Sequence, residues 1–186
     1  MIGAVLAGGA GSRFRGASKP AALLAGRPLV SYPLEALADV CDRVAVVCKR
    51  GTDLPALDGV ERWDEPDEPR HPLAGIVFAL AQADGAPVLV CAADMPFVTA
   101  DACRSLLATP PKGLAVVAAA DGVLQPTFGL YAGRALDTLR GAPPNGRLTD
   151  AVEALDPVRV AFPMRLVQSV NTPEELAEAE RLLAAA

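Results

Sequence analysis

Glycine and basic residues follow the first apolar run of the chain, and together they could bind an anion. After residues 2–7 the chain reads Gly8-Gly9-Ala10-Gly11-Ser12-Arg13, and it continues to Lys19-Pro20. Glycines let a backbone approach a ligand closely and point successive N–H groups at it. Arg13 and Lys19 supply the positive charge that glycine lacks. The segment therefore predicts a phosphate-binding loop.

The spacing in this loop excludes two familiar glycine motifs. A GxGxxG pattern beginning at Gly9 and Gly11 fails, because Phe14 stands where the third glycine is required. A Walker A motif needs adjacent glycine and lysine before Ser or Thr, whereas Lys19 lies between Ser18 and Pro20. The alternative to a binding loop is a structural glycine turn with solvated cations.

A second candidate residue, Asp94, follows the apolar run 88–92. That run shows no polar alternation, which is typical of a central strand buried on both faces. Ligands of open α/β sheets bind beyond the carboxyl ends of the strands, so Asp94 should lie near the glycine-rich loop. Magnesium takes one or two carboxylates plus phosphate oxygens and water. Asp94 is therefore a candidate magnesium ligand, and a helix-start or turn residue is the alternative.

Short apolar runs alternate with helix-like segments along the chain, which predicts how these residues are positioned. Strand followed by helix, repeated, indicates a mainly parallel sheet with helices on both faces. We expect one Rossmann-like α/β domain over residues 1–186. The expected strands are 2–7, 43–48, 60–63, 87–92, 114–119 and 158–162, and the expected helices are 29–40, 73–83, 100–108, 134–139, 149–155 and 172–185.

Charge and composition narrow the classes of ligand. The net charge is −5, which argues against a general nucleic-acid surface. Residues 1–34 nevertheless carry four basic residues and no acid, a distribution that suits a small anionic ligand. No apolar run approaches the roughly 20 residues that span a membrane. The four cysteines lack CxxC spacing and are expected to be buried thiols, so a cytoplasmic location is expected.

Several motifs, in order along nearly the whole chain, resemble one family. The pattern Leu-Ala-Gly-Gly-x3-Arg-x2-Gly-x2-Lys-Pro resembles the signature of nucleoside triphosphate transferases of the nucleotide-diphospho-sugar transferase type, especially the molybdenum cofactor guanylyltransferases. The segments that resemble further family motifs are Cys91-Ala-Ala-Asp94-Met-Pro96, His71-Pro-Leu-Ala-Gly75, Gln125–Tyr131 and Ser169-Val-Asn171-Thr-Pro173.

The resemblance implies transfer of GMP from GTP to the phosphate of molybdopterin, with release of pyrophosphate and Mg²⁺ as cofactor. It implies catalytic roles for Lys19, Arg13 and Asp94, with Asp94 as the metal ligand. Transient contact with proteins that deliver molybdopterin or receive the product is a further expectation. The implied nucleotide-binding residues are Leu6, Ala7, Gly8, Gly9, Gly11, Lys19, Asp64 and Asp94.

The chain departs from the family pattern at three positions, and rival functions stay open. His71 replaces a glycine, Ser169 replaces the first asparagine of the closing motif, and Val47 stands where a nucleotide-contacting asparagine is expected. We assign His71 no catalytic role. The close rivals are cytidylyl transfer to molybdopterin and guanylyl transfer to a cobamide precursor. A nucleotide-binding sensor is the non-enzyme alternative, and the failed GxGxxG makes a dehydrogenase the weakest one.

Overall fold

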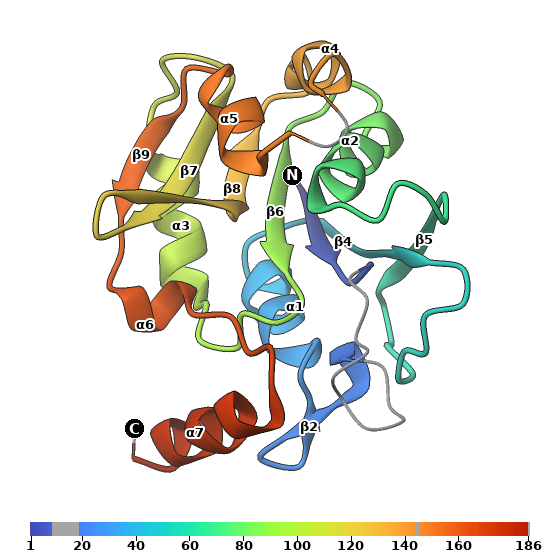
Figure 1. The fold of residues 1–186 in the computed structure, drawn as a ribbon, viewed down its shortest axis with the longest axis vertical. Coiled ribbons are helices and arrows are strands. Elements are labelled where there is room, and N and C mark those ends of the chain that lie inside the picture. The colour runs from blue at the N-terminus through green and yellow to red at the C-terminus, as the bar shows by residue number, and fades with distance from the viewer. Residues whose placement is uncertain (9–18, 144–145, 186) are drawn as a thin grey trace.

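A computed structural model describes residues 1–8, 19–143 and 146–185 (Figure 1). Its main sheet has seven strands in the order β5-β4-β1-β6-β8-β7-β9. Pairing is parallel between β1 and both β4 and β6, between β4 and β5, and between β7 and β9, whereas β8 runs antiparallel to β6 and β7. The predicted mainly parallel sheet is confirmed. The strands are β1 (Ile2–Leu6), β4 (Arg43–Lys49), β5 (Glu61–Glu65), β6 (Val88–Ala92), β7 (Ala115–Ala120), β8 (Val123–Tyr131) and β9 (Val158–Ala161).

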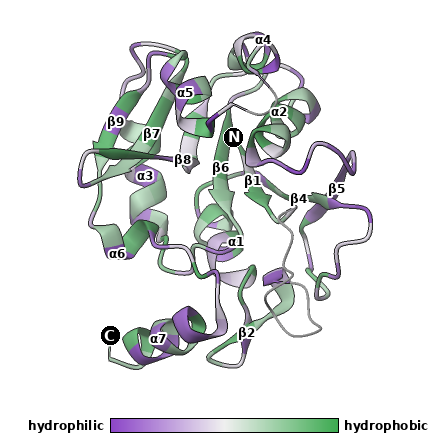
Figure 2. Ribbon diagram, viewed as in Figure 1, coloured by the Kyte–Doolittle hydropathy of each residue, from purple (hydrophilic) through white to green (hydrophobic). Residues whose placement is uncertain are grey.

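Helices cover both faces of this sheet, as predicted, because successive strand residues point to opposite faces. Val5 and Val46 pack with residues of α1 and α3 on one face, whereas Ala4 and Val47 pack with residues of α2, α4 and α5 on the other. Figure 2 shows β6 and β7 mostly green, in keeping with burial on both sides. The helices are α1 (Ser31–Ala38), α2 (Pro72–Gln82), α3 (Ala100–Ala108), α4 (Ala135–Arg140), α5 (Leu148–Glu153), α6 (Met164–Val167) and α7 (Pro173–Ala184).

The strand β6 lies in the middle of the sheet, where its uninterrupted apolar sequence led us to expect it. Its neighbour β1 is in register with it, so that Leu6 lies opposite Ala92. The amide of Ala93 then donates to the carbonyl of Leu6 at 2.9 Å. The two strands therefore end together, and the segments that follow them begin at the same edge of the sheet.

A third apolar cluster packs residues 22–29 against residues 170–183 near the C-terminus. It packs α7 against a small hairpin made by β2 (Leu23–Leu24) and β3 (Arg27–Pro28). The hairpin turns through Ala25 and Gly26, both with positive φ. Thr172 caps α7 by accepting from the amide of Glu175 at 3.2 Å, so the predicted start of this helix is confirmed.

The structure also differs from the predicted elements. Neither the β2–β3 hairpin nor the short helix α6 was predicted, because each has too few residues to show a period. The predicted helix over 29–40 is shorter, since residues 29 and 30 belong to the turn after the hairpin. No helix in the described parts of the chain is long and apolar enough to cross a bilayer.

All four cysteines are free thiols, and Cys41 alone of them is only half-buried. Burial raises the pKa of the Cys48 thiol to about 11 and that of Cys103 to about 12. They are therefore protonated at neutral pH and behave as small apolar core residues. The prediction of buried thiols holds for three of the four.

Candidate active site

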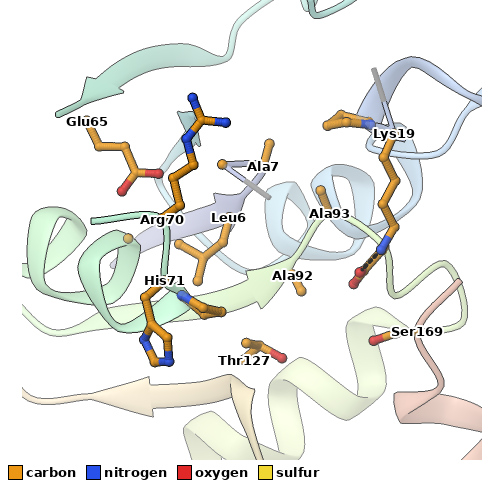
Figure 3. A pocket seen from close by; sticks show the side chains of 15 residues that line it. Leu6, Ala7, Lys19, Glu65, Arg70, His71, Ala92, Ala93, Thr127 and Ser169 are labelled. Atoms are coloured by element: carbon orange, nitrogen blue, oxygen red, sulfur yellow. Dashed lines mark hydrogen bonds and ion pairs between the residues drawn. The ribbon is translucent and has the colours of Figure 1, made fainter. Parts of the chain in front are cut away.

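A cavity of 230 Å³ opens at the carboxyl ends of β1 and β6 (Figure 3). Its floor is formed by residues 6–8 at the end of β1 and 92–94 at the end of β6. Its walls come from Lys19 and Pro20, from Glu65 and residues 70–72 before α2, and from Gly75, Thr127 and Ser169. This is the edge at which α/β sheets bind ligands.

Lys19 and Asp94 meet at one end of the cavity. The Lys19 ammonium forms an ion pair with the Asp94 carboxylate and donates to Asn171 Oδ1 at 2.9 Å. Both side chains are partly buried, with exposed fractions of 16% and 21%. The amide of Val170 donates to the backbone carbonyl of Asp94 at 2.8 Å, which ties the segment before α7 to this end. A cation from the N-terminal part of the chain and an anion from its middle thus face the same space.

Asp94 has an oxygen that fits a metal ion. Its Oδ1 is buried and accepts no hydrogen bond from the residues that the structure describes. A buried carboxylate oxygen without a donor costs free energy, unless a ligand satisfies it. No group of three or more His, Cys, Asp or Glu able to hold a metal occurs in the described residues. A single protein carboxylate suits Mg²⁺, which completes its shell with phosphate oxygens and water.

A buried ion pair forms the other end of the cavity. Glu65, the last residue of β5, lies opposite Lys49 in the parallel pairing of β4 and β5. The Lys49 ammonium is 3.4 Å from Glu65 Oε1, and the two side chains are 11% and 5% exposed. Glu65 Oε2 is buried and accepts no hydrogen bond from any described residue. Burial raises the pKa of the Glu65 carboxyl, and the Lys49 charge opposes that rise.

Gly8 lies directly against this carboxylate. A Cβ added at Gly8 would sit 2.0 Å from Glu65 Oε1 and 3.3 Å from Glu65 Cδ. Atoms cannot approach that closely, so a side chain at this position would displace the carboxylate. The sequence suggested that Gly8 lets the backbone approach a ligand, and the structure adds that it leaves room for Glu65.

The structure brings together most of the described residues that the sequence predicted for the site. Leu6, Ala7, Gly8, Lys19 and Asp94 all line the cavity. Arg13, Gly9 and Gly11 lie outside the described residues, so their predicted roles stay predictions.

Asp64 and His71 have structural partners of their own. Asp64 is exposed and forms an ion pair with Arg62 at 2.8 Å on the strand β5, and it is not part of the cavity lining. His71 is the N-cap of α2, where its Nδ1 accepts from the amide of Leu73 at 3.2 Å, and its ring also lines the cavity. The assignment of no catalytic role to His71 stays a prediction.

Sequence reasoning missed four polar residues in or behind the cavity wall. Lys49 and Glu65 are the last residues of β4 and β5, while Arg70 and Thr127 lie on the wall itself. Glu65 belongs to the acidic run 64–68, which suggested a solvated loop. The alternation of side chains along a strand could have indicated its burial. Glu65 lies on the same face of β5 as the half-buried Trp63, so it points toward the side of the sheet that helices cover.

Known proteins resemble this chain over nearly its whole length. Residues 3–158 match the family model described as MobA-like NTP transferase domain. A molybdenum cofactor guanylyltransferase from Cereibacter sphaeroides is 32% identical over 195 aligned residues, covering 98% of this chain and 97% of that protein. The crystal structure of molybdopterin-guanine dinucleotide biosynthesis protein A from Archaeoglobus fulgidus superposes with a TM-score of 0.78 at 26% identity, covering 100% of both chains.

A second solved structure has the same fold with less sequence similarity. The 2-C-methyl-D-erythritol 4-phosphate cytidylyltransferase from Thermus thermophilus gives a TM-score of 0.73 at 20% identity, over 97% of this chain and 98% of that one. Fold and cavity together define a nucleotide-binding α/β protein of the nucleotide-diphospho-sugar transferase type. The chain belongs to the MobA-like NTP transferase family.

Proposed function

We propose that this nucleotidyltransferase transfers GMP from GTP to the phosphate of molybdopterin. A phosphate oxygen of molybdopterin attacks the α-phosphorus of GTP, a new P–O–P bond forms, and the bond to the β-phosphate breaks. Pyrophosphate leaves, and the product is the guanine dinucleotide form of the cofactor. The observation that carries the proposal is the pairing of Lys19 with Asp94 in a cavity at the ends of β1 and β6. The second oxygen of Asp94 is buried and has no donor among the described residues.

Little covalent chemistry falls to the protein in such a transfer, so alignment and charge must supply the rate. Lys19 would exchange its ion pair with Asp94 for the phosphates of GTP, where its charge offsets the charge that develops on the leaving group. Asp94 would hold Mg²⁺, which neutralises phosphate charge when bound. The backbone amides that follow β1, from Ala7 through Gly9 and Gly11, would bind the phosphates together with Arg13.

The opposite end of the cavity suits guanine. Glu65 offers an acceptor oxygen that no described residue uses. An ionised carboxylate only accepts hydrogen bonds, and guanine presents two adjacent donors, its ring N1–H and its amino group. Cytosine presents an acceptor nitrogen beside its amino group, so the same carboxylate would face a lone pair. We therefore assign base recognition to Glu65, and this favours GTP over the cytidylyl alternative.

A nucleotide-binding role for Asp64, which the resemblance implied, stays a proposal. Its carboxylate forms an ion pair with Arg62, whose guanidinium also donates to backbone carbonyls of residues 49, 50 and 52. This network anchors the end of β4, so the role that it gives Asp64 is structural. Asp64 could reach a nucleotide only after leaving that ion pair.

Wider features of the function follow the same proposal. We take residues 1–186 as one nucleotidyltransferase domain that works in the cytoplasm, where the free thiols stay reduced. Its substrates are GTP and molybdopterin, and neither a nucleic acid nor a membrane is needed. Transient contact with proteins that deliver molybdopterin or receive the product completes the proposal.

The test is pyrophosphate release by purified protein with Mg²⁺, molybdopterin and each of the four nucleoside triphosphates. We expect release with GTP, and loss of release in Asp94→Asn, which keeps the shape of the side chain but removes its charge. Asp101→Asn is the matched control, because Asp101 is 91% exposed and pairs only with Arg104 among the ion pairs of the described residues.

Two results would change the assignment. Release with CTP and not with GTP would keep the transfer chemistry and refute the base. GTP binding without release, in the presence of molybdopterin, would refute the acceptor or indicate a nucleotide sensor.

A further inference from the structure

Lys49 is a buried lysine whose ion pair and hydrogen bonds in the described residues all lie at the Glu65 end of the cavity. It is the last residue of β4, and its side chain is 11% exposed. Its ammonium has a partner for each of its three N–H groups. Besides the ion pair with Glu65 Oε1 at 3.4 Å, it donates to the carbonyl of Pro66 at 2.5 Å and to that of Pro69 at 3.2 Å. The three partners are the last residue of β5 and two residues of the loop that follows it.

These contacts determine which way Glu65 faces. One carboxylate oxygen is held toward Lys49, in a position that the missing side chain of Gly8 leaves open. The other oxygen, Oε2, lies 3.7 Å from the position that a Cβ on Gly75 would take, and Gly75 itself lines the cavity. Glu65 Oε2 is therefore turned toward the cavity wall that the start of α2 forms.

The same ammonium fastens the loop that leads into α2. The carbonyls of Pro66 and Pro69 point inward to Lys49, so residues 66–69 are tied to the end of β4 at two points. Arg70 and His71 follow directly, and both line the cavity (Figure 3). One side chain thus holds both the acidic group at this end of the cavity and the start of the adjoining wall.

We propose that Lys49 is a positioning residue for base selection: it holds Glu65 and the loop 66–69 so that Glu65 Oε2 faces the nucleobase. This inference rests on the proposed function, because Glu65 is the group through which Lys49 acts. Lys49 contacts no nucleotide itself. Its removal should therefore reduce the preference for GTP over CTP while leaving the phosphate chemistry of Lys19 and Asp94 intact.

Electrostatics supports this role. Burial alone disfavours the ionised carboxylate, and the Lys49 charge opposes that effect on the pKa of Glu65. A protonated Glu65 would present an O–H donor in place of an acceptor, and guanine donors would lose their partner. The lysine therefore favours both the direction and the ionised state that guanine requires.

The experiment is a double-mutant cycle on equilibrium binding, which needs no molybdopterin. The dissociation constants of Mg²⁺–GTP and Mg²⁺–CTP are measured for the intact chain, Lys49→Met, Glu65→Gln and the double variant. Methionine keeps the apolar stem of lysine and removes the ammonium. Lys112→Met is the matched control, because Lys112 is exposed. Thermal unfolding of each variant checks that the fold is retained.

We expect Lys49→Met to lower the preference for GTP over CTP by about 10- to 100-fold, the range in which one well-placed pair discriminates between bases. Glu65→Gln should lower it similarly, and the double variant should lose no more than Glu65→Gln alone. Lys112→Met should keep the full preference. In variants that transfer GMP, kcat at saturating GTP should change far less than KM.

Three outcomes would overturn the inference. Equal weakening of GTP and CTP binding by Lys49→Met, with the preference unchanged, would make Lys49 a stabilising residue only. Additive effects in the double variant would show that Lys49 does not act through Glu65. An intact chain that binds GTP no better than CTP would leave no preference to position. Failure of GMP transfer to molybdopterin, with the cycle holding, would refute the proposed function alone.

Discussion

The contact between Gly8 and Glu65 predicts that Gly8→Ala is costly for a reason unrelated to backbone conformation. Gly8 has no positive φ, so alanine can adopt its backbone angles. Its Cβ, however, would sit 2.0 Å from Glu65 Oε1 and 3.7 Å from Lys49 Cε. The carboxylate must move, and in moving it leaves Lys49.

The size of the effect follows from two opposing terms. Separating this 3.4 Å ion pair costs about 1.5–3 kcal/mol, if it is worth as much as a hydrogen bond to a charged group. Replacing glycine by alanine restricts the unfolded chain and returns about 0.4–1 kcal/mol. We therefore expect Gly8→Ala to lower the free energy of unfolding by about 1–2 kcal/mol. GTP binding should weaken with it, since Glu65 Oε2 moves together with Oε1.

Urea unfolding at neutral pH measures the stability, and GTP titration measures the binding. Gly51→Ala is the control, because a Cβ there meets nothing within 4 Å and the backbone has no positive φ. Gly8→Ala combined with Glu65→Asp should recover part of the lost stability, since the shorter side chain withdraws from the new methyl group. A Gly8→Ala protein as stable as Gly51→Ala would refute the reasoning.

Three further predictions concern stability. The pKa of Glu65 is raised on folding, so its favourable contribution is complete below the unfolded-state pKa and is lost as pH rises through the folded-state value. The free energy of unfolding, measured in urea from about pH 4 to about pH 8, should therefore fall less steeply with pH for Glu65→Gln than for the intact chain. Parallel curves for the two proteins would contradict this. Thr172→Ala removes the cap of α7 and should cost about 1 kcal/mol by the same assay, whereas no loss would mean that water replaces the cap. Leu106→Ala empties a fully buried position on α3 and should cost about 2–5 kcal/mol with KM for GTP unchanged, and a changed KM would contradict the separation of this core from the site.

The phosphate end of the site could be predicted from the sequence because its residues follow apolar runs. Strand period and burial give β1 and β6, and the rule that ligands bind beyond strand carboxyl ends brings Asp94 beside the glycine-rich loop. The structure agrees, since Ala93 bonds to Leu6 and both segments line the cavity. The ion pair between Lys19 and Asp94 was not predicted, because nothing in the spacing alone places one residue beside the other.

The end of the cavity formed by Glu65 and Lys49, which we call the base end, could not be predicted in the same way. Its formation depends on which strands become neighbours. Lys49 and Glu65 are separated by a loop of no clear period, and each alone resembles an ordinary charged residue at the end of a strand. Only the parallel pairing of β4 with β5 puts them side by side and buries them. The family pattern pointed to Asp64, one residue away, and a shift of one residue on a strand places a side chain on the opposite face.

The two ends of the cavity rest on different parts of the sheet, and this has a consequence for specificity. In the proposed mechanism, Lys19, Asp94 and the β1 loop provide charges for phosphate transfer, while Glu65 on β5, held by Lys49 on β4, presents the acceptor for a base. Substitutions on β4 and β5 can therefore change the base without disturbing the phosphate chemistry. A cytidylyltransferase shares this fold, so the fold itself does not select guanine. Selection must lie in side chains such as Glu65, and exchanging this pair is a more direct route to altered base preference than any change in the glycine-rich loop.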